Sequence, residues 1–199
     1  ELNSLIAEVD DNYDNYEPTK AARAISNFVQ LYLSNWYVRL SRRRFWKGSY
    51  SHDKISAYQT LYKCLIVVSK LSSPIAPFFM DRLYKDLVNN TSKNPLDSVH
   101  HDEFPVSNSK EIYPDLQQKI RKAQTICSLV LSLRKKEKIK VRQPLSKIMI
   151  PFLNENEKKE ILEISELIKS EVNVKELELI SNSSGILIKK VKPCLLYTS

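Results

Sequence analysis

Glycine is scarce in this sequence: only Gly48 and Gly185 occur in 199 residues. The two common Gly-rich phosphate-binding loops need several glycines close together, so the sequence excludes both. A turn-rich β fold also uses many glycines, because tight turns need residues that tolerate positive φ. The scarcity of glycine therefore favours long helices.

Cysteine, histidine and long apolar runs are scarce as well. The cysteines Cys64, Cys127 and Cys194 form no C-x-x-C pair, which excludes a disulfide framework and a zinc knuckle and favours a reducing cytosol. The three histidines have no ligand partners at metal-binding spacing, so we expect no metal site. No apolar run reaches transmembrane length and no signal peptide is present, so we predict a cytoplasmic protein without a membrane partner.

The net charge of +8 is unevenly distributed along the chain. Residues 1–150 hold 24 Lys and Arg against 15 Asp and Glu, whereas residues 151–199 hold 7 against 8. A basic excess of this kind favours a polyanionic partner. The alternative, which charge alone leaves open, is that the excess only aids solubility.

Apolar residues at helical spacing predict most of the chain to be helical. In the second predicted helix, Tyr16–Phe45, one apolar stripe includes Ile25, Val29 and Trp36 and predicts that Trp36 packs inward. Pro74 and Pro77 predict a sharp corner between two helices. Residues 89–113 are rich in turn formers, and a connection of this length is expected to be functional or to dock on the surface. The other predicted helices cover about 2–9, 53–71, 77–87 and 114–139.

The pattern changes near Val141. A β-rich run around Pro144 is followed by a helix over 156–171, and the segments 173–181 and 185–192 read as strands joined by an "NSSG" turn. We expect these strands to pair and the helix to cover one face. The predicted fold class is therefore mainly α: a helical bundle over residues 1–140 and a small α/β subdomain over residues 141–199.

The segment "NWYVRLSRRRFWKG", residues 35–48, combines guanidinium groups with aromatic rings. RNA presents phosphates, which favour Arg and Lys on one face, and unpaired bases, which favour aromatic or guanidinium planes. Three alternatives stay open: Arg43 falls on the apolar stripe and would pair with a buried carboxylate, Trp46 caps the bundle or stacks on a base, and Trp36 is a core residue. The RNA-binding residues predicted in and near this segment are Arg39, Arg42, Arg43, Arg44, Trp46, Lys47 and Lys54.

A second basic run extends from Lys119 to Arg142 and holds nine Lys and Arg against one acid, Glu137. Cations at the end of a helix also offset its macrodipole by about 0.3–1 kcal/mol each, which is the structural alternative for residues 134–138. A rigid junction is the alternative for residues 142–144. The RNA-binding residues predicted in this run are Arg134, Lys135, Lys136, Lys138, Lys140 and Arg142.

Several segments together resemble the isoleucyl-tRNA synthetase family: "KAARAISNFVQLYLSNWYVRLSRRRFWKG", "SSPIAPFFMDRLYKDL", "SVHHDEFP", "LVLSLRKKEKIKVRQPLSKIMIP" and "SEVNVKELELI". They occur in order and cover about residues 1–193. Valyl- and leucyl-tRNA synthetases share only a looser version, and "RRRFWKG" with "KVRQPL" favours the isoleucine family. The resemblance implies the helical anticodon-binding domain of a class I synthetase. It also implies isoleucine tRNA and the catalytic domain of the same polypeptide as partners.

The catalytic signatures of the HIGH and KMSKS types and the editing domain of that family do not occur in this sequence. We therefore expect a fragment of a longer ligase, with no catalytic residues and no cofactor of its own. The resemblance implies ATP and Mg²⁺ only for the parent protein. The chain begins within a periodic pattern without an initiator Met, and its last residues, "PCLLYTS", depart from the family pattern. The alternative from another class is a helical protein-interaction module with a basic face.

Overall fold

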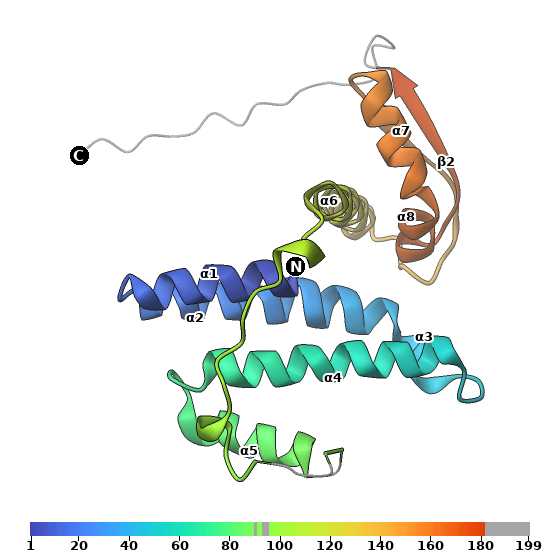
Figure 1. Cartoon of the computed structure of the whole chain (residues 1–199). Coiled ribbons are helices and arrows are strands. Elements are labelled where there is room, and N and C mark those ends of the chain that lie inside the picture. The colour runs from blue at the N-terminus through green and yellow to red at the C-terminus, as the bar shows by residue number, and fades with distance from the viewer. Residues whose placement is uncertain (90, 93–95, 182–199) are drawn as a thin grey trace. The chain divides into compact units, whose positions relative to one another are not determined.

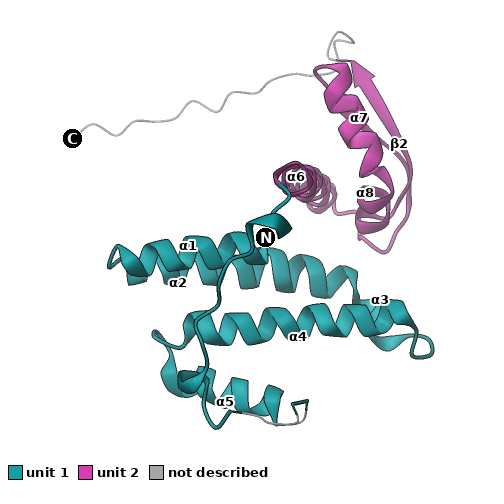
Figure 2. Ribbon diagram, viewed as in Figure 1, with its two compact units in different colours: residues 1–113 teal, residues 114–199 magenta. Residues whose placement is uncertain are grey.

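The computed structural model describes residues 1–89, 91–92 and 96–181 (Figure 1). The chain forms two compact units, residues 1–113 and 114–199 (Figure 2). The sequence predicts a domain boundary near residue 140, after the helix that begins at Pro114. The structure places the boundary between the two units before that helix, so the helix belongs to the second unit. The atypical segment "PCLLYTS" and the predicted strand over residues 185–192 lie outside the described residues.

The first unit is helical, as predicted. Pro77 is the first residue of its helix, where its missing N–H costs no hydrogen bond, and the preceding helix ends at Ser72, so the predicted corner is confirmed. The N-cap of the second helix is Glu17, and Pro18 follows it at the first helical position. The elements of this unit are α1 (Leu2–Asp14), α2 (Pro18–Asn27), the π-helix η1 (Phe28–Val38), α3 (Arg42–Trp46), α4 (His52–Ser72), α5 (Pro77–Val88), and the 3-10 turns η2 (Val99–His101) and η3 (Ser109–Glu111).

Helices α1, α2, η1 and α4 share one apolar core, and α5 packs on α4 (Figure 1). A smaller cluster joins Tyr84 and Val88 of α5 to Val99, with Ile66 of α4 packed against it. Burial of these apolar side chains is what holds the helices together, since isolated helices of this length are marginal in water. The core residues of the main cluster are Leu5, Ile6, Val9, Ala21, Ala24, Ile25, Phe28, Leu33, Cys64, Val68 and Leu71.

The π-helix η1 shifts the buried stripe that the sequence predicts. A π-helix closes each turn with one more residue than an α-helix, so the spacing between buried positions lengthens. Phe28 and Leu33, five residues apart, are both buried, and Tyr37 packs against the core. Trp36 is only half-buried and is not among the residues of that cluster, so the predicted core position of Trp36 is wrong.

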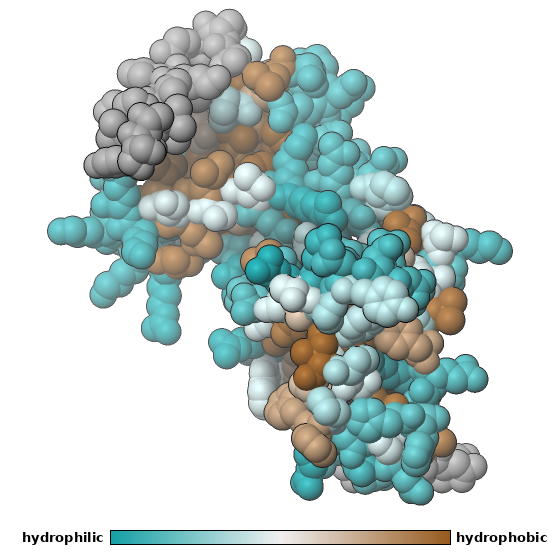
Figure 3. Space-filling model, turned by 90° about the vertical axis from the view of Figure 1, so that its left-hand side faces the viewer, coloured by the Kyte–Doolittle hydropathy of each residue, from teal (hydrophilic) through white to brown (hydrophobic). Residues whose placement is uncertain are grey.

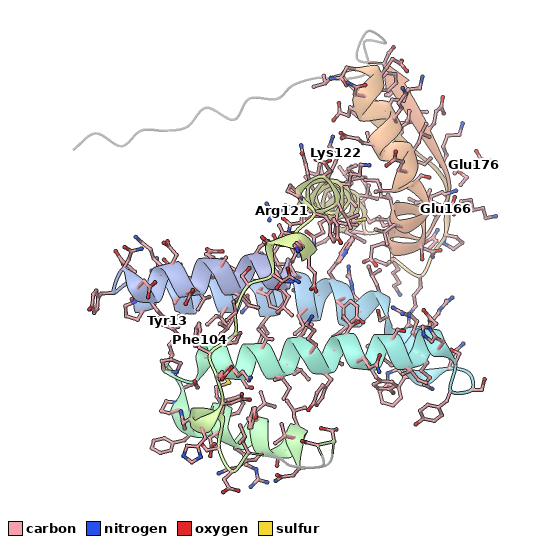
Figure 4. All side chains as sticks on the ribbon, viewed as in Figure 1. Tyr13, Phe104, Arg121, Lys122, Glu166 and Glu176 are labelled. Carbon is pink, nitrogen blue, oxygen red and sulfur yellow. The ribbon has the colours of Figure 1, made fainter. Side chains whose placement is uncertain are left out.

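The described part of the connection after α5 docks on the bundle, in agreement with the prediction. The rings of Tyr13 and Phe104 pack edge to face, with 6.1 Å between their centroids (Figure 4). The Ser107 hydroxyl donates to the Asn3 carbonyl at 2.8 Å. The Asp81 carboxylate of α5 accepts from the Ser98 hydroxyl at 2.6 Å, which fixes the start of η2.

The second unit contains a parallel two-stranded sheet. Strand β1 (Leu145–Phe152) pairs with β2 (Val174–Ser181), with Leu145 opposite Val174, and the crossover between them contains α7 (Glu155–Glu163) and α8 (Ser165–Val172). Helix α6 (Pro114–Lys136) packs against α7 and α8. The predicted pairing between 173–181 and 185–192 stays a prediction, since the later segment is not described.

The surface has the mixed character of an ordinary polar protein. On the face drawn in Figure 3, hydrophilic side chains cover much of both units, and hydrophobic surface is confined to patches. Among the helices that the structure describes, none is both long and apolar enough to cross a membrane.

Candidate nucleic-acid interface

The first basic run lies at one end of the first unit, where α3 connects to α4 through the turn Lys47–Ser51. Phe45 anchors this end: its ring is buried, and it lies 5.1 Å from the Tyr58 ring and 6.4 Å from the Tyr37 ring. The Tyr58 hydroxyl donates to the Phe45 carbonyl at 3.1 Å. With Phe45 facing inward, Arg42, Arg43 and Trp46 of α3 are exposed to solvent.

Arg44 fastens α3 to the first turn of α4. Its Nε and Nη2 donate to the two oxygens of the Asp53 carboxylate at 2.8 and 2.7 Å, and Nη2 also donates to the Asp53 carbonyl. Donating to this carboxylate raises the pKa of the Arg44 guanidinium. The positive charge of Arg44 is thus largely balanced inside the loop, and the residue is a weaker candidate for phosphate than its neighbours.

Lys54 is predicted from the sequence to bind RNA, but the structure shows it largely buried. It is 9% exposed, and its amine lies 3.4 Å from the Gly48 carbonyl and 5.2 Å from the centre of the Tyr50 ring. A lysine held in this way stabilises the turn and offers little surface to RNA. Gly48 has a φ of +78°, the left-handed region that only glycine adopts easily, so the turn itself requires this glycine.

Four predicted cations remain exposed in this run: Arg39, Arg42, Arg43 and Lys47. Arg42, Arg43 and Lys47 have no ion-pair partner in the part of the chain that the structure describes. Arg43 is exposed, so among the described residues it does not pair with a buried carboxylate. Trp46 is 81% exposed, so it does not cap the bundle.

In the second basic run, Arg134 is a structural residue. It is 2% exposed, and its guanidinium donates to the backbone carbonyls of Lys140, Gln143 and Asn173 at 3.0–3.1 Å. A side chain buried among carbonyls presents little surface to RNA, so Arg134 is a weaker candidate for the predicted RNA contact than its exposed neighbours. A count of charges along the sequence cannot distinguish a cation that is bound to backbone carbonyls from one on the surface.

The other predicted RNA-binding cations of the second run are exposed. Helix α6 ends in a C-cap motif. The backbone N–H of Lys138, a residue with a φ of 56°, donates to the Lys135 carbonyl, and the backbone N–H of Ile139 donates to the Arg134 carbonyl. Lys138 thus occupies a position that favours glycine. The exposed cations around this cap are Lys135, Lys136, Lys138, Lys140 and Arg142.

Each unit therefore presents its own set of exposed cations, one on α3 and its turn and one at the end of α6. The first set also contains aromatic surface, since Tyr50, four residues after Trp46, is 83% exposed. Tyr50 is not among the predicted residues. Its signal in the sequence is the polar Gly-containing turn "KGSYS", in which a tyrosine has no helical stripe to join.

The family model described as "Anticodon-binding domain of tRNA ligase" matches residues 1–150. The chain belongs to this family. The match covers the whole bundle, helix α6 and most of β1. The α3–α4 turn and the cap of α6, which carry the exposed cations, therefore lie within this anticodon-binding domain.

Individual relatives carry the name isoleucine–tRNA ligase. The chain is 53% identical over 191 residues to the protein of Bacteroides fragilis, which covers 96% of this chain and 17% of that protein. It is 53% identical over 192 residues to that of Cytophaga hutchinsonii, with the same two shares. Identity to the Dehalococcoides mccartyi protein is 44% over 177 residues, covering 89% of this chain and 17% of that protein. The anticodon-binding domain described here thus spans about a sixth of the length of these curated relatives.

Proposed function

We propose that this chain is the part of an isoleucine–tRNA ligase that holds the anticodon arm of isoleucine tRNA. Binding energy obtained at the anticodon arm orients the distant acceptor end toward a catalytic domain of the same polypeptide, which is where ATP-dependent aminoacylation takes place. The parent ligase works in the cytosol. The observation that carries this proposal is the family match over residues 1–150, together with 53% identity to isoleucine–tRNA ligases.

The chemistry of the exposed residues supports the same partner. Arg42, Arg43 and Lys47 give three cations within six residues that have no ion-pair partner among the described residues, and Trp46 between them is exposed. Arginine suits phosphate because its planar fork donates two parallel hydrogen bonds. Phosphate contacts of this kind set the position of an RNA, and contacts to base edges then set its sequence.

We expect this chain to bind neither ATP nor Mg²⁺ by itself. The two glycines lie far apart in the sequence, so no Gly-rich phosphate loop is formed. Over the described ranges, no three His, Cys, Asp or Glu side chains gather as metal ligands would. No chemical step is therefore assigned to this chain, and we expect no ATP–pyrophosphate exchange above background when the purified chain is given isoleucine.

The test is a titration with tRNA at several salt concentrations, with an acidic protein of similar charge as the control ligand. If about five phosphates are neutralised, log K falls against log[salt] with a slope of roughly −4. Isoleucine tRNA is compared with valine tRNA to test the choice of ligase. No binding at low salt, or a flat salt response, would contradict the proposal.

The second candidate function is a helical protein-interaction module with a basic face. It is favoured only by the charge excess, which does not distinguish one polyanion from another. Binding to the acidic protein as tight as binding to tRNA is the result that would support it.

A further inference from the structure

Trp46 and Tyr50 stand on either side of the turn that contains Gly48, and both are more than four-fifths exposed. Trp46 is the last residue of α3, and Tyr50 directly precedes Ser51, the N-cap of α4. Two aromatic side chains so exposed and only four residues apart need a reason, because large rings normally gain stability by burial. Neither ring adds to the core of the first unit.

The turn that carries them is held firmly at its base. Arg44 and Asp53 form their bidentate pair across it, and the Ser51 hydroxyl accepts from the Lys54 N–H at 3.3 Å to cap α4. The buried Phe45 immediately precedes Trp46. These contacts order the backbone that carries the rings before binding, so less conformational entropy is lost when a ligand arrives, which favours affinity.

Lys54 holds the second ring from one side. Its amine lies 5.2 Å from the centre of the Tyr50 ring, within the range of a cation–π contact, while the Gly48 carbonyl accepts from the same amine. Because Lys54 occupies one face and the ring is still 83% exposed, the other face is open to a planar ligand. The lysine thus acts as a support for the ring.

The charges around the two rings select the kind of ligand. Arg42, Arg43 and Lys47 are exposed and unpaired among the described residues, whereas the nearby carboxylate, Asp53, is paired with Arg44. Planar faces surrounded by cations fit a ligand that is both planar and polyanionic, which is a nucleic acid with unstacked bases. An apolar protein segment would bury these cations without partners, at a cost in desolvation.

We propose that Trp46 and Tyr50 form a stacking site for unpaired nucleobases of RNA, with one ring on each side of the Gly48 turn. The site rests on the proposed function, since it is the place where the loop of a bound tRNA meets the protein. The rings contribute stacking, which tolerates any base, and the arginines contribute phosphate contacts, which carry the salt dependence.

The test compares Trp46→Ala and Tyr50→Ala with Tyr16→Ala, a matched control because Tyr16 is 93% exposed and lies at the turn between α1 and α2. All three variants are expected to melt like the parent chain. Each of the first two weakens tRNA binding by roughly 5- to 150-fold, the range for one base–aromatic stack, without changing the salt slope. Tyr16→Ala binds like the parent chain.

A spectroscopic readout separates stacking from a general loss of affinity. The chain has two tryptophans, so Trp36→Phe leaves Trp46 as the sole tryptophan, whose emission can be excited apart from that of the tyrosines. Its fluorescence is quenched when a hairpin RNA with an unpaired loop binds, and it changes little with a fully paired duplex of equal length. Equal binding of Trp46→Ala, Tyr50→Ala and Tyr16→Ala, while Arg42→Ala binds weakly, would overturn the stacking site and leave the proposed function intact. No tRNA binding by the parent chain would overturn both.

Discussion

The guanidinium of Arg44 and the carboxylate of Asp53 form a bidentate ion pair, with Nε–Oδ2 and Nη2–Oδ1 distances of 2.8 and 2.7 Å. The pair joins the short helix α3 to the first turn of α4, nine residues later. It separates two kinds of arginine in the run Arg42–Arg44: one held inside the protein's own turn and two open to an external anion.

We expect Arg42→Ala and Arg43→Ala each to make the salt slope of tRNA binding shallower by about 1, because each removes one phosphate contact. Arg44→Ala is expected to change that slope little, since its charge is already balanced by Asp53. The stability loss in Arg44→Ala is less than about 1 kcal/mol, as is usual for a partly exposed pair. Salt-dependent titrations of the three variants check this, and equal slope changes in all three would contradict it.

Arg134→Met is expected to lower the free energy of unfolding of the second unit by about 2–4 kcal/mol, because it leaves backbone carbonyls without their donor. Hydrogen exchange of the amides in β1 and β2 measures the effect within that unit. Lys135→Met, at the exposed neighbouring position, is the matched control. Similar exchange rates in the two variants would show that the hydrogen bonds of Arg134 contribute nothing to the stability of this unit.

Lys138→Gly is expected to raise stability by about 0.5–1 kcal/mol, because glycine adopts the left-handed cap conformation without strain. The same change is expected to weaken tRNA binding and to reduce its salt slope by about 1, if Lys138 contacts a phosphate. Lys135→Gly is the control: it removes an equal charge but lies inside α6, where glycine costs up to about 1 kcal/mol. Thermal melting and tRNA titration give the two readouts, and destabilisation by Lys138→Gly would exclude the strain argument.

The Asp81 carboxylate makes the first unit sensitive to acid. Hydrogen bonds from Lys85, Ser98 and the Val99 N–H lower the pKa of Asp81 from 3.8 to about 2. A carboxyl group whose pKa is lower in the folded state contributes stability above its unfolded pKa and loses it as the pH falls. Stability should therefore decline between about pH 4 and pH 2, and this part of the decline should be missing in Asp81→Asn. Urea unfolding at pH 5, 3.5 and 2.5 measures it, with Asp86→Asn on the same helix as the control.

Much of the helical architecture could be predicted because it depends on local signals. Apolar spacing located the helices, and Pro77 located the corner between α4 and α5. Arg43, in contrast, is exposed although the same spacing placed it on the apolar stripe. These signals act within a few residues, so one sequence is sufficient to read them.

The predictions that failed depend on contacts between distant residues or on helix geometry. The inward position of Trp36 assumed an α-helical period, whereas η1 has a longer one. Arg134 looked like a surface cation because its acceptors, such as the Asn173 carbonyl, lie far along the chain. The parallel pairing of β1 with β2 joins segments about thirty residues apart, and no local turn signal marks it.

The π-helix also sets the direction in which the following arginines point. Each turn of η1 takes up one residue more than an α-helical turn would, so everything after Val38 is rotated about the helix axis. Deleting one residue between Phe28 and Val38, without a change of helix type, would turn the residues that follow by the rotation of one residue, roughly 100° in an α-helix. The length of this segment therefore sets the direction of the residues that follow it. A single insertion or deletion there would redirect a whole cluster of cations without changing any of them.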